Sequence, residues 1–157
     1  MIALGDPLTG RERRVVAAVA VNKSNAGVAA DLGLSLWTVK EHLSQIAVKL
    51  GVGDRSGIVG AAIRTRQLDV PVSRPTPPGF DELLFDVLVR IARGLSNAQI
   101  AAELHLSVDA VKSRVRRLLA VLGADSRESA VAAGFACGVL RLVPAPRAAE
   151  ARSEVAA

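Results

Sequence analysis

One segment of this 157-residue chain occurs twice, 72 positions apart and without a gap. The first copy, residues 25–40, reads NAGVAADLGLSLWTVK, and the second, residues 97–112, reads NAQIAAELHLSVDAVK. A repeat of this length is one supersecondary unit used twice, so it predicts two domains of the same fold.

The stretch between the two copies predicts where these domains separate. Residues 68–79 read LDVPVSRPTPPG, and four prolines with a closing glycine cannot continue inside a helix. The sequence therefore predicts a Pro-rich linker at 68–79 between a first domain at 1–67 and a second, divergent domain at 80–142. Residues 143–157 are predicted to form a flexible tail.

Capping residues and apolar spacing predict an all-α fold. Half of the residues are apolar and only 3% are aromatic, and no stretch alternates as a strand does. Caps and glycine stops predict four helices in the first domain, at about residues 9–21, 24–32, 35–50 and 54–66. The matching caps of the second domain are Asp81, Ser96, Ser107 and either Asp125 or Ser126.

Each repeated segment has the plan of a helix-turn-helix, in which a short helix, a tight turn and a longer helix follow one another. The longer helices are expected at about residues 36–50 and 108–122. Each carries one apolar stripe at helical spacing, formed by Val39, Leu43, Ile46 and Leu50 in the first copy and by Val111, Val115, Leu118 and Leu122 in the second.

The polar face of each longer helix is the candidate functional surface. It carries Thr38, Lys40, Glu41, Ser44 and Gln45 in the first copy and Lys112, Ser113, Arg116 and Arg117 in the second, with Arg114 at its edge. Long polar side chains on successive turns can reach base edges and phosphates in a DNA major groove. In one isolated copy, such a face is equally typical of a solvated helix. Two copies with matching caps, turn and stripe favour DNA binding.

Net charge supports this hypothesis only in part. The chain has a net charge of +5 and a pI of about 10.3, which fits nucleic acid or an anionic membrane surface. Residues 1–67 hold nine basic and five acidic residues, and residues 80–142 hold eight and seven. Four of those eight bases lie between Lys112 and Arg117, so the second domain concentrates its charge on the candidate helix.

Other function classes find little support. Cys137 is the one cysteine, so no disulfide can form within the chain. His42 and His105 have no second ligand at metal spacing, and no catalytic constellation stands out, so we expect no enzyme activity, metal or cofactor. The first residues do not show the basic-then-apolar pattern expected of a secretory signal, and the longest apolar run, residues 130–140, is too short to span a bilayer. These features predict a cytoplasmic, nucleoid-associated protein without a membrane partner.

The sequence resembles the bacterial LuxR-type helix-turn-helix domain, also called the NarL/FixJ or GerE type. The first copy carries LTGRERRVV and then SNAGVAADLGLSLWTVKEHLSQIAVKLGVGDR, in the order and spacing of the family's elements. The second copy keeps SNAQIAAELHLS and VKSRV but opens with FDELLF. In the second copy Leu84 therefore stands where Glu12 stands in the first, and Val121 stands where Lys49 does.

The resemblance implies two four-helix domains, each with its third helix in the major groove. It implies base-reading roles for Lys40, Glu41 and Ser44 and for Lys112, Ser113 and Arg116. It implies phosphate contacts for Thr38 and Lys49, which we extend to Ser35, Ser107, Arg114 and Arg117. It also suggests that Glu12 pairs with Arg55, in which case Arg127 would lack the equivalent partner.

In the family the fourth helix is a dimer interface. This implies that the two copies pair within one chain as a pseudo-dimer through Val59, Ala62, Ile63, Val131, Gly134 and Phe135. The alternative is that each fourth helix packs only on its own domain. The twelve-residue linker reaches at most roughly 40 Å, about one turn of DNA with slack. Two-fold pairing predicts an inverted repeat as target, and copies in series predict a direct repeat.

Two further hypotheses stay open at this point. The stretch VDAVKSRVRRLL also resembles a sigma-factor region-4 recognition helix. Alternatively, one or both repeats do not bind DNA and instead hold RNA polymerase or another regulator. Glu41 and Trp37 keep this second hypothesis open, although a position at the edge of the core is favoured for Trp37. The partners expected are thus double-stranded DNA, a polymerase or regulator, and a second copy in a homodimer.

Overall fold

The computed structural model describes residues 2–21 and 24–141, and within these ranges it contains eight α-helices and no strand. The all-α class predicted from the sequence is confirmed. The tail predicted at 143–157 lies outside the described residues. The first repeat consists of α1 Gly10–Ala20, α2 Asn25–Leu32, α3 Leu36–Leu50 and α4 Arg55–Arg64. The second consists of α5 Glu82–Ala92, α6 Asn97–Leu104, α7 Val108–Leu122 and α8 Arg127–Ala136.

The helices begin at the capping residues that the sequence predicts. Thr9 Oγ1 accepts a hydrogen bond from the Glu12 backbone N–H at 3.2 Å, and the Glu12 carboxylate accepts one from the Thr9 N–H at 2.7 Å. This reciprocal pair satisfies two N–H groups that the first helical turn leaves free. Ser96 and Gln99 form the same arrangement at α6. Of the two residues considered for α8, Ser126 is the cap.

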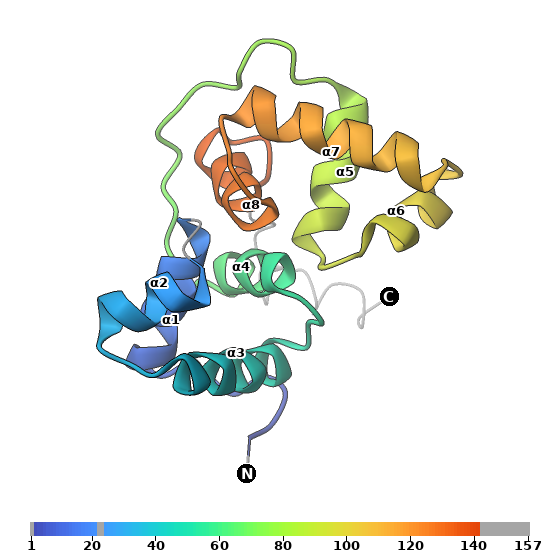
Figure 1. Cartoon of the computed structure of the whole chain (residues 1–157). Helices are drawn as coiled ribbons and strands as arrows, with labels where there is room; N and C mark the ends of the chain where they lie inside the picture. Colours follow the sequence, from blue (N-terminus) through green and yellow to red (C-terminus); the bar gives the residue numbers. More distant parts are fainter. Residues whose placement is uncertain (1, 22–23, 142–157) are drawn as a thin grey trace, which may run out of the picture.

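The two repeats share one continuous hydrophobic core. The fourth helix of the first repeat, α4, packs against both α8 and α5 of the second, and α8 in turn packs against α1. Helices α1 and α4 of the first repeat correspond to α5 and α8 of the second. The contact between α4 and α5 is therefore equivalent to the contact between α8 and α1, so each repeat uses the same surface to face the other. Figure 1 shows the result, with α4 and α8 in the centre and α3 and α7 at opposite ends. An interface built in this way has a two-fold-like symmetry.

Two glycines of α4 bring it close to the backbone of the second repeat. A methyl group on Gly57 would lie 3.0 Å from the Gly94 Cα, and one on Gly60 would collide with the Ala92 carbonyl oxygen. Ser56 Oγ, also on α4, donates to the Ile91 carbonyl at 3.0 Å and is itself buried. The short side chains of α4 therefore decide how near the two repeats can come.

The residues predicted to form the inter-repeat interface are buried, but they do not all serve one purpose. Ile63 and Phe135 line one cavity together with residues of the linker. A side chain at Gly134 would meet Leu88 and Leu140 of its own repeat, so its small size also serves packing within the second domain. Val59, Ala62 and Val131 have no exposed surface and belong to the shared core.

The Pro-rich linker is bonded to the second repeat. The backbone N–H groups of Ser73 and Arg74 both donate to the Ala136 carbonyl, at 2.9 and 3.1 Å. Thr76 Oγ1 donates to the Cys137 carbonyl at 3.5 Å. These carbonyls lie at the C-terminal end of α8, where no intrahelical donor reaches them. The linker thus closes the C-terminal end of α8.

A buried ion pair in the first repeat corrects the pairing suggested by the resemblance. Glu12 bonds to Lys49, with Nζ and Oε2 2.8 Å apart and both side chains almost wholly buried. Arg55 instead bonds to Asn25 at the start of α2 and lies 3.5 Å from Glu128 of the second repeat. Arg127, which was predicted to lack the equivalent partner, donates a hydrogen bond to Asn97 at 2.8 Å, as Arg55 does to Asn25 in the first repeat.

Loss of the Glu12 charge should destabilise the protein at acid pH. Burial raises the pKa of Glu12, but the hydrogen bonds from Lys49 and Thr9 outweigh it, so the pKa lies below its ordinary value of about 4.5. A carboxylate whose pKa is lowered by folding contributes stability in full above that ordinary value, and the contribution is lost as pH falls through the native pKa. Urea unfolding between pH 3 and 7 should show this loss. Glu12→Gln should flatten that part of the curve, and an unchanged curve would contradict the assignment.

Candidate nucleic-acid interface

The first helix-turn-helix is formed by α2, the turn at residues 33–35, and α3. Gly33 ends α2 in the left-handed conformation, with φ of +64°, and the Leu34 N–H bonds back to the Ala29 carbonyl at 2.9 Å. Ser35 then caps α3 by accepting from the Thr38 N–H at 3.0 Å. His105 takes the place of Gly33 in the second copy, with φ of +54°. The turn geometry is thus the same in both repeats although its residue differs.

The structure exposes the residues predicted to read bases in the first repeat. Lys40, Glu41 and Ser44 lie on the exposed face of α3, opposite the buried Val39 and Ile46. The Glu41 carboxylate accepts a hydrogen bond from the Gln45 side chain at 3.0 Å. This face therefore carries one cation, one carboxylate and the neutral side chains of Ser44 and Gln45. Its positive charge, which would attract an anionic duplex, is offset by the charge of Glu41.

The equivalent face of α7 is more strongly basic. Lys112, Ser113 and Arg116 are exposed, and the Arg116 guanidinium donates to Ser113 Oγ at 3.2 Å. Lys112 lies 3.6 Å from Asp109, but both side chains are more than half exposed, so solvent screens this pair. Of the four bases between Lys112 and Arg117, three are exposed on α7 and Arg114 is half-buried.

The predicted phosphate contacts fall into two groups. Ser35, Thr38 and Ser107 lie at the N-terminal ends of α3 and α7, where free N–H groups attract anions. Arg114 is half-buried, and Arg117 pairs with Asp81 at 3.0 Å on the surface. These side chains stay near the candidate surface.

Lys49 is a correction to this set. Its amine is held by Glu12 at 2.8 Å and by the Pro7 carbonyl at 3.4 Å, and the residue is only 9% exposed. Moving it to a phosphate would leave the Glu12 carboxylate buried without its cation, which is costly. We therefore assign Lys49 to the core of the first repeat.

Trp37 is a second correction, because it is 72% exposed rather than placed at the edge of the core. Leu36, beside it, is 47% exposed, and both lie in the first turn of α3. The exposure of Leu36 was not predicted from the sequence. The signal was available, since neither residue belongs to the apolar stripe that begins at Val39. The two side chains add an apolar patch to one end of the candidate surface of the first repeat.

Among the described residues, no helix is long and apolar enough to cross a membrane. Within the same ranges, histidine, cysteine and acidic side chains form no group of three or more that could hold a metal ion.

The paired helix-turn-helix units, each with an exposed polar third helix, define a class of protein, the tandem helix-turn-helix proteins. The family model for bacterial regulatory proteins of the luxR family (GerE) matches residues 6–62 and 85–133, which is more than half of the chain. The chain belongs to this family. The match to both segments also confirms the resemblance on which the assignment of the second, divergent repeat rested.

Curated proteins similar to the chain are transcriptional regulators by name. The probable transcriptional regulatory protein NarL of Mycobacterium tuberculosis is 42% identical over 62 residues, which are 40% of this chain and 29% of that protein. The probable transcriptional regulatory protein SgaR of Hyphomicrobium methylovorum is 45% identical over 51 residues, 32% of this chain and 24% of that protein. The transcriptional regulatory protein MctR of Rhizobium johnstonii is 33% identical over 58 residues, 37% of this chain and 27% of that protein. The chain thus spans less than a third of the length of these relatives. No solved structure matches it significantly.

Proposed function

We propose that the chain is a transcription regulator that binds double-stranded DNA sequence-specifically. In this proposal the two repeats act as an intramolecular pseudo-dimer, with α3 and α7 in successive major grooves. Membership of the luxR family and the regulator names of the similar proteins support DNA as the partner. A regulator of chromosomal DNA would act in the cytoplasm, at the nucleoid.

The single observation that carries the pseudo-dimer is the two-fold-like packing around α4 and α8. Because the contact between α4 and α5 is equivalent to the contact between α8 and α1, α3 and α7 occupy equivalent positions at opposite ends (Figure 1). A two-fold relation between reading helices matches a two-fold relation between half-sites. We therefore expect an imperfect inverted repeat as the target, with unequal half-sites, since the polar faces of α3 and α7 differ.

Selection from random duplexes followed by titration at increasing salt tests this proposal. We expect the enriched motif to be an inverted repeat, and affinity to fall steeply between 50 and 200 mM salt because each phosphate contact releases counterions. Arg116→Ala should cost about 1–3 kcal/mol at one base position. The matched control is Arg74→Ala, which removes an exposed guanidinium of the linker. Absence of duplex binding at low salt would overturn the regulator function, and an enriched direct repeat would overturn the pseudo-dimer.

A second candidate function is a protein-interaction module, and one specific observation favours it. Leu36 and Trp37 present an exposed apolar patch at the start of α3, one helical turn before Lys40 and Glu41. Large exposed aromatic side chains are enriched in protein interfaces. In this alternative the first repeat holds RNA polymerase or another regulator, while the second reads DNA.

The fluorescence of Trp37, the one tryptophan in the chain, separates the two functions. If α3 binds DNA as α7 does, the selected duplex should change this fluorescence, and Trp37→Ala should weaken duplex binding. If α3 holds a protein, the duplex should leave the fluorescence unchanged and purified RNA polymerase should change it. Purified polymerase without effect on Trp37 would contradict the polymerase alternative.

A further inference from the structure

The junction of the two repeats contains two neighbouring cavities near the C-terminal ends of α4 and α8. The larger, of about 780 Å³, is lined from both repeats and from the linker, and the smaller, of about 570 Å³, from α4, α5 and the end of α8. They share Phe135, Leu140 and Arg141 as a common wall. Each volume falls in the range of small-molecule binding sites.

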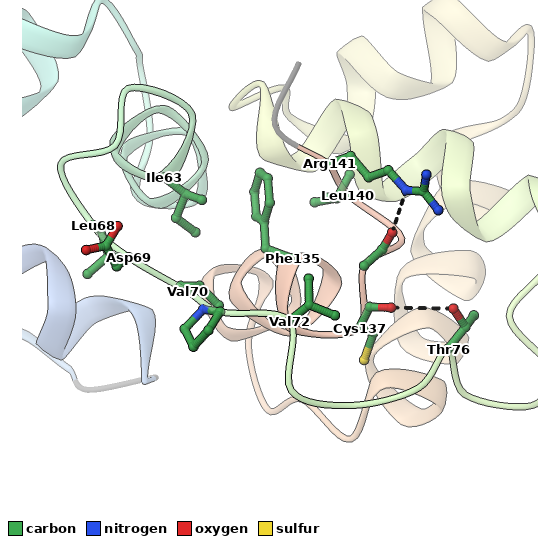
Figure 2. A pocket seen from close by; sticks show the side chains of 12 residues that line it. Ile63, Leu68, Asp69, Val70, Val72, Thr76, Phe135, Cys137, Leu140 and Arg141 are labelled. Carbon is green, nitrogen blue, oxygen red and sulfur yellow. Dashed lines mark hydrogen bonds between the residues drawn. The ribbon is translucent and has the colours of Figure 1, made fainter. Parts of the chain in front are cut away.

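The lining of these cavities is mainly apolar. In the larger cavity, Ile63 of α4 and Phe135 of α8 face each other, and Val70 and Val72 of the linker lie below them in the view of Figure 2. Phe85, Val89 and Val139 continue the apolar lining in the smaller one. Burial of the apolar part of a ligand against such a lining would be favourable.

Three guanidinium groups are found around this lining, contributed by Arg64, Arg93 and Arg141. Arg64 donates to the Ala92 carbonyl at 3.1 Å, and Arg141 donates to the Gly138 carbonyl at 3.3 Å. In the described part of the chain, neither has a carboxylate partner, and Arg93 shares Glu103 with Arg90. One acidic residue, Asp69, lines the larger cavity, on the linker side in Figure 2.

The charged side chains that line the smaller cavity are therefore all arginines, and Arg64 and Arg141 have no carboxylate partner among the described residues. Partial burial and the nearby Arg93 lower the pKa of Arg64, which is the direction expected for a cation whose surroundings lack an anion. A carboxylate accepts two parallel hydrogen bonds from one guanidinium and would neutralise this excess.

We propose that the junction is a binding site for a small amphipathic carboxylate, with its apolar body against Phe135 and Leu140 and its carboxylate at Arg64 and Arg141. The ligand would contact α4 of the first repeat, α5 and α8 of the second and, in the larger cavity, the linker. A molecule bound there would link the two repeats at the point where their relative position is set. The proposal does not rest on DNA binding.

Calorimetric titration of the full chain with decanoate, in the absence of DNA, tests the site. We expect one decanoate per chain, with decan-1-ol binding at least tenfold more weakly because it lacks the charge. Arg141→Met should weaken decanoate at least tenfold, and the matched control Arg74→Met, an arginine that lines neither cavity, should not. Val72→Phe should also weaken it, by filling the larger cavity from an exposed position.

Three results would overturn the proposal. Decanoate could fail to bind, it could bind no better than decan-1-ol, or its affinity could be the same in Arg141→Met and Val72→Phe as in the wild type. The experiment also tests a competing occupant of the cavities, the segment that follows Arg141 and begins with Leu142 and Val143. If the full chain binds decanoate only after both are changed to serine, that segment is the occupant, and the ligand site in the native chain is overturned. Because no duplex is present, either outcome leaves the proposed regulator function to its own test.

Discussion

Lys49→Val alone should lower the free energy of unfolding by about 3–5 kcal/mol, because it leaves the Glu12 carboxylate buried without its cation. Glu12 is 2% exposed and Lys49 is 9% exposed, so water cannot replace the lost partner without a rearrangement of the core. Pairs of exposed charges contribute much less because solvent screens them, so the expected effect comes from burial. Urea unfolding at pH 7 measures the change.

The double variant Glu12→Leu with Lys49→Val should lose much less than the sum of the single variants. Replacing a buried ion pair by apolar residues of similar size is often close to neutral, although loss of the Glu12 bond to the Thr9 N–H should cost about 1 kcal/mol. In the second repeat the equivalent positions are already apolar, with Leu84 in place of Glu12 and Val121 in place of Lys49. Additive effects in the double-mutant cycle would contradict a direct coupling of Glu12 and Lys49.

Gly60→Val should cost about 3 kcal/mol or more by separating the two repeats. A side chain at this position meets the Ala92 carbonyl oxygen. This backbone atom cannot rotate away, so α4 and α5 must move apart. The expected loss of stability is therefore at the upper end of the range observed when a core is overpacked. The change would also disturb the Arg64 bond to the same carbonyl. Thermal and urea unfolding should both report the loss.

The matched control for Gly60→Val is Gly10→Val. Gly10 is also a helical glycine, but a side chain built there meets nothing within 4 Å. The control should therefore be neutral or slightly stabilising, since valine has a better helix propensity than glycine. Equal effects of the two substitutions would show that the close approach of α4 and α5 does not hold the repeats together.

Much of the fold could be predicted because its signals are local. Each helix of the first repeat begins directly after its capping residue, which is Thr9, Ser24, Ser35 or Asp54. The apolar stripe from Val39 to Leu50 depends only on the helical period. The exposure of Lys40 and Arg116 follows from the same period, because the apolar stripe fixes which side of the helix faces the core. These features hold whatever the distant parts of the chain do.

Other features could not be predicted, because they depend on distances between segments that are remote in sequence. The buried pair of Glu12 and Lys49 spans 37 positions, and the resemblance suggested Arg55 as the partner of Glu12. Nothing in the spacing of Gly57 and Gly60 indicates the backbone of the second repeat as their neighbour. A position at the core edge is expected for Trp37 because large aromatic residues are often buried, but the core is formed by smaller aliphatic residues and Trp37 is exposed.

The sequence by itself determined the duplication, the eight helices with their caps, and the family, because each is written in neighbouring residues or in a fixed offset. Only the tertiary structure decided how the repeats face each other. It placed Lys49 inside and Trp37 outside, and it left apolar cavities bordered by arginines where the repeats meet. The physical reason is that packing is a property of surfaces from distant segments, and a pattern of residues along one helix does not specify the surface that will cover it.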